Sequence, residues 1–260
     1  MIPYPDEEKI TWEFAPGEKT AALFASPSDA AEHIVLLVHG FMSSKNSDTN
    51  RTLTALLLEQ GIASLRFDLF GHGESDGPFT QLTLSRCLRQ VDGVMNWIKT
   101  KGYKKISMVG SSFGGLIGIH TASQYTHLNA LALRCPVSHY PRIWQDRLGP
   151  AGIARWKEDE MLSFVTEDGR ARLAYSFYHD LLQHDTYTAA SHIKTPTLIV
   201  HGDADSDVPV DQSIRLFDTL RLKTEDKRFI QMPGADHGFS KPDDFSAMIQ
   251  QIMTWITSPH

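Results

Sequence analysis

Short apolar runs alternate with helical patterns along most of the chain, and this alternation limits the possible folds more than any other feature. The run I-V-L-L-V at 34–38 is followed by a segment, 49–60, that places Leu53, Leu56 and Leu57 on one helical face. Unbroken apolar runs are typical of parallel strands that are covered on both sides. Further runs of this kind lie at 63–67, 105–109, 130–133, 197–200 and 228–232. The sequence therefore predicts βαβ crossovers and a mostly parallel sheet.

The remaining regular elements complete an eight-stranded α/β architecture. Two further strands at 9–14 and 20–25 flank the turn sequence A-P-G-E, which favours an antiparallel hairpin. Helices are predicted between the strands, so they cover both faces of the sheet. The predicted helices that follow 49–60 lie at 83–99, from about 112 onward, at 211–222 and at 243–256.

One long segment interrupts this rhythm. Between 138 and 193 no strand-like run occurs, and aromatic residues are scattered through the segment. A connection of this length without a role is uncommon in a compact domain. We therefore predict a single domain over 1–260 with a mostly helical cap, 138–193, inserted within it.

Composition and charge exclude several classes of protein. With 41% hydrophobic and 22% charged residues, the 260-residue chain has the composition of an ordinary globular protein. Its formal net charge of -6 argues against a nucleic-acid partner, since such partners require a concentrated basic surface. The two cysteines, Cys87 and Cys135, are too few for a secreted disulfide scaffold and are predicted to be reduced and buried.

The segment 106–133 carries no Asp, Glu, Lys or Arg and is long enough to span a membrane. It is interrupted by glycines and by polar residues, so a buried strand–helix–strand unit explains the missing charges better. The chain also begins with an acidic, proline-rich stretch that does not resemble a secretory signal. We therefore predict a cytoplasmic protein without membrane association.

A serine stands between two glycines where one apolar run meets the next helix. The motif is G-S-S-F-G at 110–114, a G-x-S-x-G directly after the run 105–109. On such a sharp turn the serine backbone is strained, and glycines two positions away on either side avoid a steric collision. The pattern indicates that Ser112 is a nucleophile at a helix N-terminus, whose dipole faces developing negative charge. The alternative is an ordinary glycine-rich turn.

Three other loops that follow apolar runs carry groups suited to acyl transfer. The turn H-G-F at 39–41 places a backbone N–H where it can stabilise an oxyanion. The loop D-A-D-S-D at 203–207 offers an acid, and His237 in G-A-D-H-G offers a general base. Serine, acid and histidine then follow in that order, each after a separate strand. An ordinary turn at 39–41 and solvated aspartates are the alternatives.

These motifs resemble those of the α/β-hydrolase superfamily over nearly the whole chain. Within this superfamily they resemble bacterial carboxylesterases of the feruloyl (cinnamoyl) esterase and monoglyceride-lipase-like type. The resemblance is carried by H-G-F, R-F-D-L-F-G-H-G-E-S-D-G, G-S-S-F-G-G, H-G-D-A-D-S-D-V-P and G-A-D-H-G-F. One departure is Ser111, because many relatives carry histidine before the nucleophile.

The resemblance implies an α/β-hydrolase fold and a role for each matching residue. Ser112 corresponds to the nucleophile and His237 to the base. The acid is the aspartate of G-x-x-D-x-x-V-P, which here selects Asp205. The implied oxyanion donors are the backbone N–H groups of Phe41 and Phe113.

Two further residues in the matching motifs are expected to have structural roles. His72 is expected to make a structural hydrogen bond, and Asp68 resembles a position that braces the region around the nucleophile. No cofactor or metal is predicted, because the sequence contains no H-E-x-x-H, no C-x-x-C and no phosphate-binding G-K-[ST].

The predicted reaction is hydrolysis of a small-molecule carboxylic ester through an acyl-enzyme. Thioester, amide or carbon–carbon bond hydrolysis would use the same three residues, because the choice of leaving group depends on the pocket walls. Dehalogenases and epoxide hydrolases of this fold carry Asp in place of Ser112. A non-catalytic ligand-binding protein on the same fold is a further alternative, but such a protein would be expected to lack one of the three residues.

Overall fold

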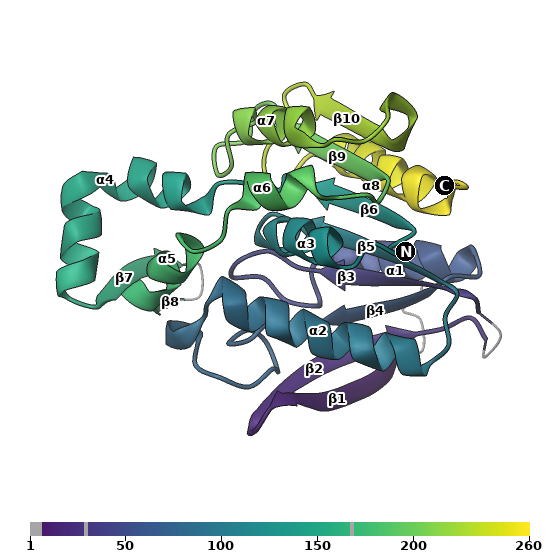
Figure 1. Ribbon diagram of the computed structural model, residues 1–260, viewed down its shortest axis with the longest axis horizontal. Helices are drawn as coiled ribbons and strands as arrows, with labels where there is room; N and C mark the ends of the chain where they lie inside the picture. Colours follow the sequence, from purple (N-terminus) through teal and green to yellow (C-terminus); the bar gives the residue numbers. More distant parts are fainter. Residues whose placement is uncertain (1–6, 29–30, 167–168) are drawn as a thin grey trace.

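The computed structural model describes residues 7–28, 31–166 and 169–260 and contains one large sheet with helices on both faces (Figure 1). The spatial order of its strands is β1-β2-β4-β3-β5-β6-β9-β10. Strand β2 is antiparallel to both of its neighbours, and all the other neighbouring pairs are parallel. This confirms the predicted mostly parallel sheet of eight strands. Their bounds are β1 (Glu8–Ala15), β2 (Glu18–Ala25), β3 (His33–Val38), β4 (Ala63–Phe67), β5 (Lys105–Ser111), β6 (Ala130–Arg134), β9 (Thr197–Gly202) and β10 (Lys227–Met232).

Two hydrophobic cores form because successive side chains of a strand point to opposite faces. In β3, Ile34 and Leu36 belong to the core beneath α2, α3 and α7, whereas Val35 and Leu37 belong to the core beneath α1 and α8. A strand buried in this way on both faces has no polar alternation, which explains the unbroken apolar run. The helices around the sheet are α1 (Asp48–Glu59), α2 (Leu84–Thr100), α3 (Phe113–Gln124), α7 (Asp211–Thr219) and α8 (Pro242–Thr257), with two short 3-10 helices, η1 (Phe79–Gln81) and η2 (Thr224–Asp226).

Helix α7 ends at Thr219, three residues earlier than the sequence pattern suggested. Leu220 adopts an extended conformation and is buried in the core. The ammonium of Lys227, at the start of β10, donates hydrogen bonds to the carbonyls of Phe217 (3.0 Å) and Leu220 (2.9 Å). A side chain from the next strand therefore satisfies carbonyls at the helix end, a role that lysine often plays there.

The segment 138–193 extends from the carboxyl edge of the sheet, at the left in Figure 1. It is mostly helical, but it also contains an antiparallel hairpin that the sequence analysis did not predict. The hairpin packs on the helical part, where the indole N–H of the buried Trp156 donates to the carbonyl of Leu173 (3.0 Å). A small two-stranded sheet of this kind lacks the long apolar runs that marked the main strands. The elements are α4 (Tyr140–Glu158), β7 (Met161–Thr166), β8 (Gly169–Ala174), α5 (Tyr175–Leu181) and α6 (Thr186–Ser191).

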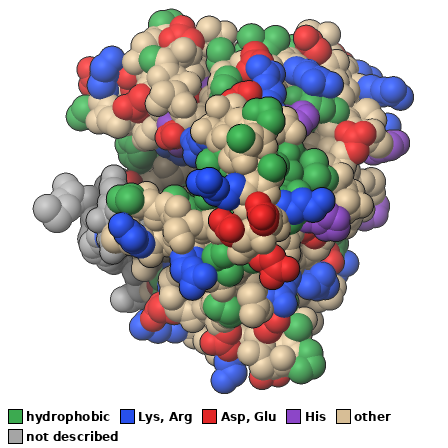
Figure 2. Space-filling model, turned by 90° about the vertical axis from the view of Figure 1, so that its left-hand side faces the viewer, with side chains coloured by type: hydrophobic (Ala, Val, Ile, Leu, Met, Phe, Trp, Pro, Cys, Tyr) green, Lys and Arg blue, Asp and Glu red, His purple; other side chains and the backbone are tan. Residues whose placement is uncertain are grey.

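The charge-free segment 106–133 forms β5, α3 and β6, as predicted, and both cysteines are free and buried. Among the described residues, no helix combines the length and apolar character needed to cross a bilayer. On the face of the molecule shown in Figure 2, Lys and Arg side chains are interspersed with Asp and Glu. No single sign of charge dominates that face.

Burial keeps several histidines neutral, and His120 on α3 is a clear case. It is 6% exposed, and its Nε2 lies 3.3 Å from the hydroxyl of Thr186. Burial lowers the pKa of His120 to about 4; repulsion from His184 adds to the shift, and the charge of Asp185 opposes it. In the unfolded chain the same group titrates near a pKa of about 6.5.

This difference predicts a loss of stability in mild acid. Below about pH 6.5 the unfolded state binds more protons at this position, so the free energy of unfolding falls as the pH falls toward 4. The contribution of one such histidine approaches about 1.4 kcal/mol per pH unit. Urea unfolding at pH 7, 5.5 and 4.5 should therefore show a weaker pH dependence in His120→Gln than in the wild type. Parallel pH profiles for the two proteins would contradict this account.

Candidate active site

Ser112 stands at a sharp turn between β5 and α3, with φ 54° and ψ -113°. A non-glycine residue is rarely found there, and such strain costs on the order of 1–3 kcal/mol, so the surroundings must hold it in place. The N–H of Ser112 donates to the carbonyl of Arg134 (2.9 Å). The carbonyl of Ser112 accepts from Gly115 (2.9 Å) and Val137 (3.1 Å). Bonds to β6 and α3 therefore fix the strained residue from both sides.

Two glycines allow the backbone to pack tightly around this turn. A Cβ on Gly114 would lie 2.3 Å from the carbonyl oxygen of Val38 and 2.5 Å from that of His39, so only glycine fits between α3 and the end of β3. A Cβ on Gly40 would lie 3.2 Å from the Cβ of Ser112 and 3.8 Å from its Oγ. The turn at 39–41 therefore runs directly beside the Ser112 side chain.

Asp205 and His237 meet at the ends of β9 and β10. Nδ1 of His237 lies 2.7 Å from Oδ2 of Asp205, whose side chain is fully buried. The other carboxylate oxygen of Asp205 accepts from the N–H groups of Asp207 (2.9 Å) and Val208 (2.8 Å). Burial alone would raise the pKa of Asp205, but the hydrogen bonds from His201, His237 and the backbone outweigh it and hold the pKa well below its usual range. Asp205 is therefore ionised at neutral pH.

The other two aspartates of this loop face elsewhere. Oδ1 of Asp207 forms an exposed ion pair with Arg147 on α4 (3.0 Å). Oδ1 of Asp203 accepts a hydrogen bond from the N–H of Gly234 (2.6 Å). Of the three candidate acids, the structure brings only Asp205 to His237.

His201 is a residue of this site that the sequence analysis missed. Its Nε2 lies 3.1 Å from Oδ2 of Asp205 and 2.9 Å from the carbonyl of Val208, and its Nδ1 lies 2.7 Å from the hydroxyl of Ser213. The ring is completely buried and contacts the same carboxylate oxygen as His237. H-G-D at 201–203 was visible in the sequence, but nothing in the pattern showed that this ring turns toward Asp205.

The ligand atoms of Cys135, His201 and Asp205 lie within 4.8 Å of one another, which is close enough to hold a metal ion. Their chemistry does not favour one. Burial raises the pKa of the Cys135 thiol to about 12, so the thiol stays protonated, whereas a metal requires the thiolate. Both ring nitrogens of His201 already contact protein groups, and Asp205 already contacts His237. We assign the cluster to hydrogen bonding around Asp205.

Two neutral histidines hold the turn at 39–42. Nε2 of His39 accepts from the N–H of Leu69 (3.0 Å), and its Nδ1 lies 2.7 Å from the carbonyl of Gly40. Nε2 of His72 accepts from the N–H of Met42 (3.1 Å), and its Nδ1 lies 3.0 Å from the carbonyl of Phe70. Burial lowers the pKa of both rings, that of His39 to about 3, so each ring stays neutral with an acceptor nitrogen. His72 makes the structural hydrogen bond expected of it.

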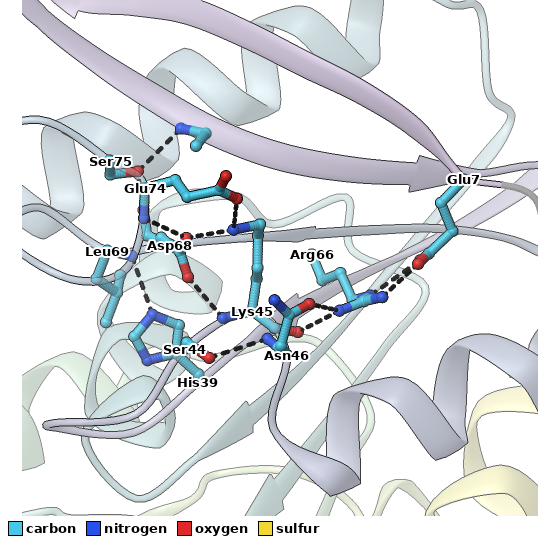
Figure 3. Close-up of polar contacts among 11 residues, drawn as sticks. Glu7, His39, Ser44, Lys45, Asn46, Arg66, Asp68, Leu69, Glu74 and Ser75 are labelled. Atoms are coloured by element: carbon cyan, nitrogen blue, oxygen red, sulfur yellow. Dashed lines mark hydrogen bonds and ion pairs between the residues drawn. The ribbon is translucent and has the colours of Figure 1, made fainter. Parts of the chain in front are cut away.

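Asp68 anchors the part of the chain around Lys45, which follows the turn at 39–42 (Figure 3). Its carboxylate accepts from the N–H (2.7 Å) and the ammonium (2.6 Å) of Lys45, and from the N–H of Glu74 (2.9 Å). Burial by itself lowers the pKa of Lys45, but the hydrogen bonds to Asp68 and Glu74 more than offset this, and the pKa is raised. Asp68 therefore has a structural role, as the resemblance implied, and it acts through the loops at 45 and 74. Only the fold shows these contacts, because Lys45 lies about twenty residues before Asp68 and Glu74 lies in the turn that follows it.

Two pockets meet at Ser112, Phe41 and His237, which line both. One has a volume of about 680 Å³ and lies against the inserted segment; its other lining residues include Tyr140, Trp144 and Phe164. The second has a volume of about 690 Å³, is more polar, and lies between the start of α1 and the loop after His237. A molecule bound at Ser112 would therefore have separate space on each side.

Comparison with known proteins identifies the family. Residues 35–248 match the model of the alpha/beta hydrolase family. The chain belongs to this family. The family predicted from the sequence motifs is therefore confirmed, and with it the general class of the protein, a hydrolase.

Individual relatives have low sequence identity to this chain, but the alignments cover most of it. The chain is 24% identical over 224 residues to palmitoyl-protein thioesterase ABHD10, mitochondrial, of Bos taurus, covering 84% of this chain and 71% of the relative. It is 23% identical over 242 residues to 2-hydroxy-6-oxo-6-(2'-aminophenyl)hexa-2,4-dienoic acid hydrolase of Metapseudomonas resinovorans, covering 82% and 81% of the two chains. A similar solved structure is Est1E of Butyrivibrio proteoclasticus with bound ferulic acid, with a TM-score of 0.80, 24% identity, and coverage of 96% of this chain and 100% of that one. This last likeness shows the shared fold.

The tight packing around Gly114 predicts that this position cannot tolerate a methyl group. In Gly114→Ala the added Cβ must push α3 away from β3 and shift Ser112, and a displacement of about 1 Å at a reacting group costs about 100-fold in rate. We expect labelling of Ser112 by a fluorophosphonate to slow by about that factor.

Gly118→Ala in the same helix is the matched control. Its Cβ would meet only the ends of flexible side chains, at 3.3 Å or more from Leu133, Leu131 and Met108. Labelling near the wild-type rate is expected. Equal labelling rates for the two variants would contradict the close-packing argument.

Proposed function

We propose that the protein is a serine hydrolase that cleaves carboxylic esters through an acyl-enzyme, with Ser112, His237 and Asp205 as its triad. The observation that carries the proposal is the position of Ser112, which lies on a strained turn and lines the same two pockets as His237. The ring of His237 is oriented by the buried carboxylate of Asp205. Strain at a nucleophilic residue is typical of active sites, because it holds the side chain in a reactive position.

Each residue has one step to perform. Oγ of Ser112 attacks the ester carbonyl, and its proton passes to Nε2 of His237. Asp205, which accepts from Nδ1 of that ring, stabilises the imidazolium that forms. The proton then moves to the departing alcohol, and a water molecule repeats the sequence to release the acid. His201 acts as a positioning residue, because it orients the carboxylate of Asp205.

The backbone N–H groups of Phe41 and Phe113 are the proposed oxyanion donors. Phe113 follows the nucleophile at the start of α3, and Phe41 lies in the turn beside Ser112. Within the described part of the chain, neither N–H group donates a hydrogen bond to another residue. The bonds from His39 and His72 hold the Phe41 turn in place before substrate arrives. Removal of one such preorganised donor costs about 3–4 kcal/mol in a serine protease.

The inserted segment 138–193 is proposed to act as a cap that selects substrates. The Phe41 ring lies in a cluster of aromatic rings, with centroid distances of 6.0 Å to Tyr140, 6.2 Å to Trp144 and 6.4 Å to Phe164. These side chains line the pocket next to Ser112, so an apolar or aromatic part of the substrate fits there.

Thioester, amide and carbon–carbon bond hydrolysis would use the same residues of the proposed triad, and a named relative is a thioesterase. A cytoplasmic location also stays a prediction, since that relative is named as mitochondrial.

Replacing the nucleophile should abolish turnover without unfolding the protein. In Ser112→Ala we expect hydrolysis of p-nitrophenyl butyrate to fall by about 10⁴–10⁶-fold, because the three residues act as a unit. A fluorophosphonate should label the wild type at Ser112, located by mass spectrometry of peptides. Labelling at the neighbouring Ser111, or normal turnover by a folded Ser112→Ala, would refute the assignment.

Three single substitutions distinguish the acids of the 203–207 loop. Asp205→Asn should lose about 10³–10⁴-fold in kcat, because the amide holds His237 in the wrong tautomer. Asp203→Asn and Asp207→Asn are matched controls that contact Gly234 and Arg147 instead, and each should retain turnover within about tenfold. A larger loss in either control than in Asp205→Asn would reassign the acid.

A further inference from the structure

The more polar of the two pockets contains a buried arginine that the mechanism does not use. Arg134 is the last residue of β6 and lies beside the Ser112 turn, whose N–H its carbonyl accepts. Its side chain is 8% exposed and lines the pocket together with Ser112 and His237.

No carboxylate pairs with this guanidinium. Among the described residues, no Asp or Glu oxygen lies within 4.0 Å of its nitrogens. One terminal nitrogen donates to the carbonyl of His237 (2.7 Å), the ring of Phe239 lies 5.1 Å from Cζ, and Nε has no hydrogen-bond partner. The charges of Asp205 and Asp236 reach it only through space. Because a buried charge without a carboxylate partner is disfavoured, this guanidinium is well suited to pairing with an anion.

A second buried polar group lies at the same place. The hydroxyl of Ser111, directly before the nucleophile, is 7% exposed and has no hydrogen-bond partner. The remaining wall includes Ser47 and Thr49 at the start of α1, which also contributes Asp48. A guanidinium without a carboxylate partner and a hydroxyl without any hydrogen-bond partner line the same pocket, and together they offer donors to an oxygen anion.

We propose that this pocket, which we call the Arg134 pocket, binds a carboxylate group on the substrate. The proposal rests on the proposed esterase function and defines its substrate class: esters that carry an ionised acid on one side of the scissile bond. An apolar or aromatic part of the substrate then occupies the pocket against the inserted segment. Both pockets share Phe41, Ser112 and His237, so one extended substrate reaches both with its ester carbonyl at Ser112.

Matched ester pairs test this substrate class. In the first pair, 4-nitrophenyl hydrogen glutarate is compared with 4-nitrophenyl methyl glutarate, which removes a charge on the acyl side. In the second, 4-carboxyphenyl butyrate is compared with its methyl ester, which removes a charge on the alcohol side. We expect the wild type to prefer the charged member of one pair in kcat/KM, and the pair that shows this identifies the part of the substrate in the Arg134 pocket.

Arg134→Gln should reduce this preference by about 10- to 100-fold, the usual effect of a charge-assisted hydrogen bond. Because Arg134 also holds the carbonyl of His237, the readout is the ratio of charged to neutral substrate within each variant. Arg134→Lys should restore part of the preference, and Ser111→Ala should reduce it less than Arg134→Gln does. Arg215→Gln removes the same charge from the exposed surface of α7 and should leave the ratio unchanged.

A binding measurement separates this proposal from the proposed function. Ser112→Ala protein is titrated calorimetrically with the same four esters, with and without Arg134→Gln. The proposal is supported if a charged ester binds more tightly than its neutral partner and Arg134→Gln removes this difference. This holds even if the wild type hydrolyses none of the esters. The proposed carboxylate site would be overturned if the neutral esters are hydrolysed as well as the charged ones in both pairs, and if charged and neutral esters bind equally.

Discussion

The strained backbone of Ser112 is the constraint on which the rest of the site depends. Its conformation is unfavourable for any residue with a side chain, and it persists because β6 and α3 bond to it on both sides. The same turn leaves no room for a side chain at Gly114 and brings Gly40 against the serine. A single packing arrangement therefore sets the position of the candidate nucleophile relative to the turn that carries Phe41.

Buried polar groups then fix the loops around this turn. Asp205 accepts hydrogen bonds from two histidine rings and two backbone amides, so its charge is stabilised although its side chain is fully buried. Asp68 and Lys45 form a second buried pair, which anchors the loop after the Phe41 turn. Pairs of this kind contribute to a unique geometry more than to net stability, because desolvation offsets much of their attraction. Each loop around Ser112 is held by contacts of this type.

The two pockets at Ser112 differ in chemistry. Aromatic side chains of the inserted segment make one pocket suitable for apolar groups. The other contains Arg134, whose charge has no carboxylate partner within the described protein. A site with aromatic side chains on one side and a buried guanidinium on the other would select its ligands by both shape and charge. This division arises because the segment 138–193 covers only one side of the sheet edge.

The sequence by itself determined the parallel sheet, because short unbroken apolar runs that alternate with helical patterns are typical of strands buried on both faces. It also determined the family and the places of Ser112 and His237 in the strand order, since local motifs carry that information. The family motif had already selected Asp205 among three aspartates, and the tertiary structure shows that only this one contacts His237, because one loop turns the three side chains in different directions. Only the tertiary structure revealed the contacts of Asp68, His201 and Arg134. The contacts of Asp68 to Lys45 and of Arg134 to His237 join separate elements, and the contacts of His201 depend on how one loop folds back, so no local pattern encodes them.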